Sequence, residues 1–145
     1  MKLKIACIRG ISLRDECVRV VAMDDASSLY DLHDMIQDAV SFDRDHLFTF
    51  YTANSGSPWA KRHRIAVTED WEEMADALDR IKLRDIWPLD RKKLYYRFDF
   101  GDDWIFEITK MRSTKADASL PSGTILERIG PDPHQYPVSE DWGDR

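Results

Sequence analysis

Residues 99–104 read Asp-Phe-Gly-Asp-Asp-Trp and gather three carboxylates in one short segment. Carboxylates this close repel one another unless a positive charge compensates them, which makes the segment a candidate cation site. His33 and His46 add two imidazoles, and a mixed set of His and Asp ligands can hold a divalent metal that activates water. One hypothesis is therefore a metal-dependent hydrolase or nuclease that uses His33, His46, Asp99 and Asp102.

The same residues have a simpler structural interpretation. Hairpin tips collect Asp because its side chain accepts hydrogen bonds from the amides of the turn. A single His at the edge of an apolar helix face is usually a hydrogen-bonded core residue. A metal site would need the ligand atoms within about 2–2.6 Å of one point, which depends on the fold. On the simpler interpretation the chain needs no metal or other cofactor, and we predict none.

Motifs of the common catalytic classes are absent from the sequence. It has no glycine-rich phosphate-binding loop, no HExxH pair, no CxxC pair and no nucleophile elbow. It is rich in aromatic residues, at 11%, and Tyr and Trp are favoured anchors of protein interfaces. We therefore predict a non-enzymatic protein-binding or adaptor module. Its candidate binding residues are Trp59, Arg62, Asp103, Trp104, Tyr136 and Trp142.

A weaker alternative is an accessory protein that binds nucleic acid. The loop Trp59–Arg64 combines an aromatic residue with several basic ones, as proteins that bind single strands do. The formal net charge of −6 argues against this function, because affinity for nucleic acid depends on neutralising phosphates with Lys and Arg.

Length and composition suit one domain. A chain of 145 residues with 43% hydrophobic and 33% charged residues can bury a core without disulfides or metals. Cys7 and Cys17 are too few for a disulfide framework. No apolar stretch has the length of a signal peptide or a membrane span, so we expect a cytoplasmic protein with no membrane partner.

Two helices are predicted from caps and apolar periodicity. Ser28 and Asp31 form a capping box at the start of the first helix, which carries His33 at the edge of its apolar face. The second helix spans about 69–81, with an apolar stripe against a charged face. Alternating or β-branched runs predict further strands at 2–9, 16–23, 46–52, 64–67 and 124–129. The strand at 46–52 is expected to present His46 and Phe48 on one face.

The best strand pair is Leu94–Phe100 with Trp104–Lys110. A three-residue loop between them keeps the large apolar side chains on one face, with the pairs Phe100–Trp104, Phe98–Phe106 and Tyr96–Ile108. This register sets Arg97 opposite Glu107. It also requires Asp103, or a neighbour, to adopt the left-handed backbone conformation usually taken by Gly.

Together these elements predict an α+β fold with a largely antiparallel sheet. The order is β-β-α-β-(β)-α-β-β-(β), and both helices pack on one face. We expect a mobile loop at about 113–123 and an irregular, proline-rich tail at 130–145, within a single domain that spans 1–145.

The motifs also resemble those of a known family. Three segments carry the resemblance: Ser28–His33 with Ile36 and Gln37, then Asp45–Phe48 with Phe50, then Tyr96–Trp104. They are similar to the Ri-plasmid ORF-three-like family, and the similarity spans nearly the whole chain. The resemblance implies a small α+β protein of a kind carried on plasmids and other mobile elements, and it implies no particular activity.

The tail adds a finer likeness. Residues 130–137 read Gly-Pro-Asp-Pro-His-Gln-Tyr-Pro and resemble the ending of a subgroup described as passenger proteins of an insertion element. The commoner family ending has an acidic pair, a Cys and a Gly pair. Residues 140–144 here have Trp142 in place of the Cys and a single Gly, so a role that depends on that Cys does not transfer to this chain.

Overall fold

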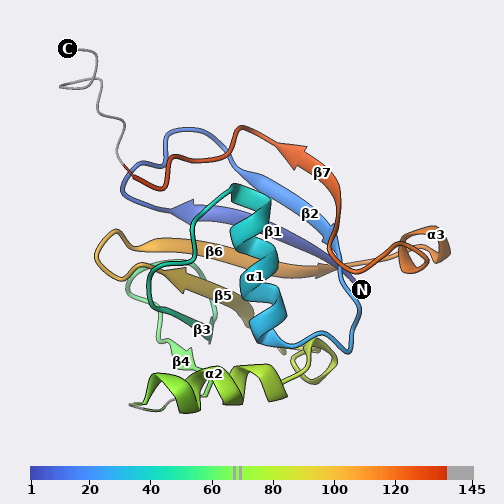
Figure 1. The fold of residues 1–145 in the computed structure, drawn as a ribbon, viewed down its shortest axis with the longest axis horizontal. Helices are drawn as coiled ribbons and strands as arrows, with labels where there is room; N and C mark the ends of the chain where they lie inside the picture. The colour runs from blue at the N-terminus through green and yellow to red at the C-terminus, as the bar shows by residue number, and fades with distance from the viewer. Residues whose placement is uncertain (67, 69, 137–145) are drawn as a thin grey trace.

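The computed structural model describes residues 1–66, 68 and 70–136, and its strands form one antiparallel sheet (Figure 1). Their spatial order is β4-β3-β5-β6-β1-β2-β7. The strands are β1 (Lys2–Arg9), β2 (Val18–Ala22), β3 (Phe48–Ala53), β4 (His63–Arg64), β5 (Lys93–Phe98), β6 (Trp104–Met111) and β7 (Thr124–Ile129). The helices are α1 (Leu29–Val40), α2 (Trp71–Arg80) and α3 (Lys115–Ala118), with a 3-10 turn, η1, at Leu83–Asp85. The predicted α+β fold and the predicted order of its elements are confirmed.

Helix α1 lies across one face of the sheet, and α2 lies near β4 (Figure 1). Leu29, Leu32 and Ile36 of α1 recur at helical spacing and are fully buried in the same core as residues of the sheet. Met74 and Leu78 of α2 belong to the same core, so both helices pack on one face of the sheet, as predicted. Burial of each such side chain stabilises the fold by roughly 1.5–3 kcal/mol.

The predicted capping box begins helix α1. The Ser28 hydroxyl accepts a hydrogen bond from the Asp31 amide at 3.0 Å, and the Asp31 carboxylate accepts one from the Ser28 amide at 2.9 Å. Asp70 caps α2 by accepting from the Glu72 amide at 2.9 Å. These bonds satisfy amides that have no partner inside the helix, and so fix where each helix begins.

Arginines from two strands hold the other end of α1. Arg19 of β2 is 1% exposed and donates to the Ala39 carbonyl at 3.0 Å, and Arg128 of β7 donates to the same carbonyl at 3.0 Å. Asp132 accepts from Arg19 at 2.7 Å. Because the carbonyls at a helix C-terminus carry partial negative charge, two guanidinium groups are favourable there. The arrangement ties the start of the tail to the helix.

Gly130 allows the tail to follow this path. Its φ is +80°, and a Cβ at this position would lie 1.6 Å from the Glu16 carbonyl oxygen. Only Gly fits both conditions. The tail therefore leaves β7 close against the β1–β2 loop and turns toward α1.

The β5–β6 hairpin differs from the predicted register by two residues. The observed pairs are Phe98–Trp104, Tyr96–Phe106 and Leu94–Ile108, so the predicted pairs are wrong. The connecting loop spans 99–103 rather than three residues. Arg97 lies opposite Ile105, so its predicted position opposite Glu107 is also wrong. A shift of two leaves each side chain on its predicted face, because side chains alternate with period two.

The wider loop has a physical cause. Asp99 and Asp103 both have positive φ, of 56° and 54°, and the Asp103 amide donates to the Asp99 carbonyl at 2.7 Å. Asp tolerates this left-handed conformation better than most residues. The predicted left-handed Asp103 is confirmed, and Asp99 adds a second such position that the prediction lacked.

Other boundaries also differ from the prediction. Strand β3 begins at Phe48, so His46 precedes the strand instead of sharing its face. Helix α3 lies within the predicted loop 113–123. Residues 130–136 form no helix or strand, as predicted, and the rest of the predicted tail, with Trp142, lies outside the described residues. No helix in the described part of the chain is long and apolar enough to cross a membrane.

Candidate functional site

His33 lies in the core beneath α1 and is 3% exposed. Its Nδ1 is 2.5 Å from the Tyr96 hydroxyl, and the Gln37 amide donates to the same hydroxyl at 2.9 Å. The imidazole stacks on Phe48, with 3.7 Å between ring centroids. The Tyr96 hydroxyl therefore accepts from Gln37 and donates to His33, which satisfies each of these buried polar groups.

Burial lowers the pKa of His33 to about 4, although Asp34 opposes part of this shift. The imidazole is therefore neutral at pH 7 and accepts through Nδ1. Its Nε2 lies 4.0 Å from the Asp34 carboxylate. Among the described residues no hydrogen bond or ion pair joins His33 to Asp99 or Asp102.

His46 does reach the acidic hairpin loop. Its Nε2 is 3.4 Å from the Asp99 carboxylate, 3.1 Å from the Asp45 carboxylate and 3.2 Å from the Tyr136 hydroxyl. The Asp102 amide donates to Asp99 at 3.4 Å on the other side. Of the four candidate metal ligands, the fold thus brings His46, Asp99 and Asp102 together. His33 contacts none of these three and bonds to Tyr96 instead.

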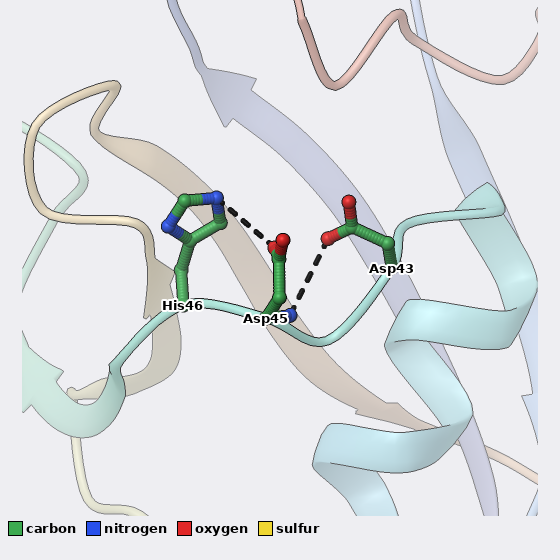
Figure 2. Close-up of side chains that lie close together, drawn as sticks. All are labelled: Asp43, Asp45 and His46. Carbon is green, nitrogen blue, oxygen red and sulfur yellow. Dashed lines mark hydrogen bonds and ion pairs between the residues drawn. The ribbon is translucent and has the colours of Figure 1, made fainter.

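The turn between α1 and β3 supplies two further carboxylates, Asp43 and Asp45 (Figure 2). The Asp43 carboxylate accepts from the side-chain amide of Gln135 at 2.5 Å and from the Tyr136 hydroxyl at 2.9 Å. The side-chain carbonyl of Gln135 in turn accepts from the backbone N–H of Asp43 at 2.7 Å. Burial opposes ionisation of Asp43, but hydrogen bonding with Asp45, Gln135 and Tyr136 outweighs it and lowers the pKa to about 2. The tail therefore binds this turn through paired polar contacts.

One arrangement of these groups could hold a metal. Asp43, Asp45 and His46 each offer a ligand atom, and these atoms lie within 4.8 Å of one another (Figure 2). Carboxylate and imidazole ligands together suit ions such as Mn²⁺ or Zn²⁺. Tyr136 donates into this set, so a bound ion would have to displace its hydroxyl or use it as a ligand.

The other residues of the acidic loop serve the hairpin itself. Asp103 accepts from Arg97 at 2.6 Å and from Arg9 at 3.4 Å; burial opposes its ionisation, but these guanidinium groups lower its pKa. Burial, together with Asp99, raises the pKa of Asp102. Trp104 is fully buried, so its side chain offers no surface to a partner.

The loop Trp59–Arg64, which was the candidate for binding nucleic acid, lies on the opposite face of the sheet. There Ala60 packs against a small second cluster of buried residues that includes Tyr51. Trp59 is 92% exposed there. The Arg62 guanidinium stacks over the Tyr51 ring at 4.6 Å. Arg62 therefore packs against the sheet, which leaves fewer free cations for phosphates on this loop.

A groove opens beside His46, between α1, the start of β3 and the start of α2. It consists of two adjoining hollows, of about 330 and 170 Å³, that share Leu47, Phe48 and Trp71. The larger, which we call the polar hollow, is also lined by Tyr30, His33, Arg44, Asp45 and His46. The smaller, which we call the apolar hollow, is also lined by Thr49, Arg64, Thr68, Met74 and Phe100. Together they form the Leu47 groove.

Large apolar side chains are exposed along the Leu47 groove. Leu47 is 55%, Phe100 41% and Trp71 38% exposed. They come from the turn before β3, the β5–β6 loop and the first residue of α2. Trp71 packs edge-on against Phe48 with 5.1 Å between centroids, which fixes its position. Clustered exposed apolar groups of this kind mark interaction sites on protein surfaces.

Leu47, Trp71 and Phe100 are not among the site residues predicted from the sequence. In the sequence, Trp71 fits the apolar stripe of the second helix and Phe100 fits a buried strand pair, so neither stands out as a surface residue. The alternation of the strand does indicate that Leu47 faces away from the core, because it is out of phase with the buried Phe48 and Phe50. That Leu47, Trp71 and Phe100 come together depends on contacts between distant segments, which no local pattern contains.

These observations define a small α+β protein with one antiparallel sheet, two helices on one face and a groove where they meet. The chain belongs to the family of plasmid pRiA4b ORF-3-like proteins, whose model matches residues 3–132. The match confirms the family resemblance and includes the β5–β6 hairpin. No curated protein matches the chain.

A solved structure has a similar fold. It is the crystal structure of a protein of unknown function, MM3350, from Methanosarcina mazei Go1. The two superpose with a TM-score of 0.64 at 18% sequence identity, over 90% of this chain and 69% of that chain. This likeness extends the fold to a second protein and carries no activity with it.

Proposed function

We propose that this protein is a non-enzymatic binding module that takes a short segment of a partner protein in the Leu47 groove. The observation that supports the proposal most is the exposure of Leu47, Trp71 and Phe100 around one groove. Covering such side chains contributes about 25 cal/mol for each Å² of apolar surface removed from water.

Two of the polar groups in or near the groove, His33 and Asp43, are bonded within the fold and so favour recognition over catalysis. A general base needs a free lone pair directed at its substrate. The Nδ1 atom of His33 is bound to Tyr96, and the Asp43 carboxylate is bound to Gln135 and Tyr136. These side chains are already committed to holding the fold and the tail.

A displayed library of random peptides tests the proposal. We expect the wild-type protein to enrich peptides whose affinity falls at least tenfold in Leu47→Ser or Phe100→Ser, because each substitution removes an apolar contact at the groove. Leu120→Ser is the control, since Leu120 is 37% exposed and lines a different hollow with Met1 and Ala22. A failure to enrich peptides, or binding that both groove variants retain in full, would exclude this function.

The geometry of Asp43, Asp45 and His46 favours one other candidate, a divalent-metal site in a hydrolase or nuclease. Calorimetric titration with Mn²⁺, Mg²⁺ and Zn²⁺ distinguishes it. A metal site predicts binding that His46→Asn weakens, together with a higher melting temperature at saturating metal. Absence of both heat and stabilisation with all three ions would eliminate the candidate.

A further inference from the structure

Five carboxylates lie in or next to the polar hollow of the Leu47 groove. Asp45 lines the hollow, and Asp99 and Asp43 lie against His46 and Asp45. Asp34 and Asp38 bind Arg44, which also lines the hollow. Among the described residues, Arg44 binds Asp34 and Asp38, the His46 imidazole lies against Asp45 and Asp99, and the His33 imidazole lies 4.0 Å from Asp34. The excess of carboxylates gives this end of the groove a negative potential.

Asp45 is the carboxylate best placed to meet a ligand. It lines the polar hollow, and its side chain is 58% exposed. Its carboxylate lies 3.1 Å from the His46 imidazole and 3.3 Å from the Tyr136 hydroxyl, and Asp43 lies beside it. Among the described residues no Lys or Arg pairs with Asp45, so a Lys or Arg side chain from a partner would supply a fixed positive charge that these residues do not.

The cations of the groove reinforce its polarity. Arg44 lines the polar hollow but is held by Asp34 and Asp38. Arg64 lines the other, apolar hollow, next to Phe100 and Met74. The groove is therefore acidic around one end, whereas the other end combines an apolar lining with the Arg64 guanidinium. This difference sets a direction for anything that lies along the groove.

We infer that the Leu47 groove recognises an extended, basic segment of a partner protein, with one apolar side chain in the apolar hollow and one Lys or Arg in the polar hollow. The inference rests on the proposed function and names its partner. Alternate side chains of an extended chain point the same way about 6–7 Å apart, so neighbouring positions can reach adjoining hollows. The apolar hollow, at about 170 Å³, is smaller than usual ligand pockets and suits a single side chain.

The selected peptides and a pair of charge variants test this inference. We expect enriched peptides to combine an apolar residue with a nearby Lys or Arg, and their affinity to fall as salt is raised. Asp45→Lys should weaken them at least tenfold, because it places a like charge at the polar hollow. Asp25→Lys changes the net charge equally at an exposed site in a different hollow, and should leave affinity within about twofold.

The outcomes separate the inference from the function on which it rests. Peptides that need Leu47 but are neutral or acidic, or that bind Asp45→Lys as well as wild type, would overturn the basic partner and leave the binding module intact. Asp45→Asn provides the same comparison should the charge-reversed variant fold poorly. Peptides that lose affinity equally in Asp45→Lys and Asp25→Lys would indicate attraction to the whole acidic surface, and would also overturn the inference.

Discussion

His33 has the chemistry of a catalytic residue but is held as part of the core. Its Nδ1 accepts from Tyr96, its ring stacks on Phe48, and burial lowers its pKa to about 4. In the unfolded chain the pKa returns to its ordinary value of about 6.5. Between these values the unfolded chain binds a proton that the folded protein excludes, so acidification favours unfolding.

This linkage predicts a pH-dependent loss of stability. Between pH 7 and pH 5, the wild-type protein should lose about 2 kcal/mol more of its free energy of unfolding than His33→Phe does. The variant keeps an aromatic ring against Phe48 and removes the titrating group. Chemical denaturation of both proteins at each pH measures the difference. Parallel pH profiles would mean that folding does not shift the His33 pKa.

Helix α1 illustrates how elements are held by groups from other elements. Its own capping box fixes the N-terminus, whereas Arg19 of β2 and Arg128 of β7 hold the Ala39 carbonyl at its C-terminus. The two arginines differ in burial, since the Arg19 side chain is 1% and the Arg128 side chain 50% exposed. Water can replace the contacts of Arg128 more readily than those of Arg19, whose hydrogen bonds to the Val18 and Ala39 carbonyls are buried.

The difference in burial predicts unequal effects of substitution. Arg19→Met should lower the free energy of unfolding by about 3 kcal/mol, because it removes four hydrogen bonds of a buried guanidinium, to the carbonyls of Val18, Ala39 and Ile129 and to the Asp132 carboxylate. Arg128→Met should cost less than about 1 kcal/mol, as exposed pairs usually do. Urea denaturation compares the two. Equal losses would contradict the assigned roles.

Local patterns predicted the elements of this fold better than the pairing between them. Caps and apolar periodicity predicted α1 and α2 correctly, because each of these patterns is contained within a short stretch of sequence. The predicted register of the β5–β6 hairpin was wrong by two residues, because the observed loop requires both Asp99 and Asp103 to adopt the left-handed conformation. Asp occurs in many conformations, so its presence does not specify which one it takes.

The candidate site was predictable only in part. His46 and Asp99 were chosen for their chemistry, and they do lie together, at 3.4 Å. The partner of His33 is Tyr96, 63 residues away, and that contact exists only once α1 has packed on β5. The Leu47 groove depends in the same way on contacts between segments far apart in sequence, so no single motif predicts it.

Across the whole molecule, one strand pair joins the two parts of the sheet. The arrangement β4-β3-β5-β6 meets β1-β2-β7 through the antiparallel pairing of β6 with β1. Helix α1 packs over both parts in one shared core (Figure 1). Both parts therefore contribute side chains to one cluster of buried apolar residues.

The shared core predicts a single unfolding transition, as expected for the one domain inferred from chain length. Tryptophan fluorescence and far-ultraviolet circular dichroism should give the same urea midpoint, because Trp104 and both helices report on the same core. Two separated midpoints would instead indicate parts that fold independently, and would contradict the single domain.

The central place of β1 has a consequence for synthesis. Residues 2–9 emerge from the ribosome long before residues 104–111, although the two segments are neighbours in the finished sheet. At about 5–20 residues per second, the nascent strand waits roughly 5–20 s with an unpaired edge. Such an edge is a template for pairing with other chains. Faster translation should therefore raise the yield of native protein by shortening that exposure.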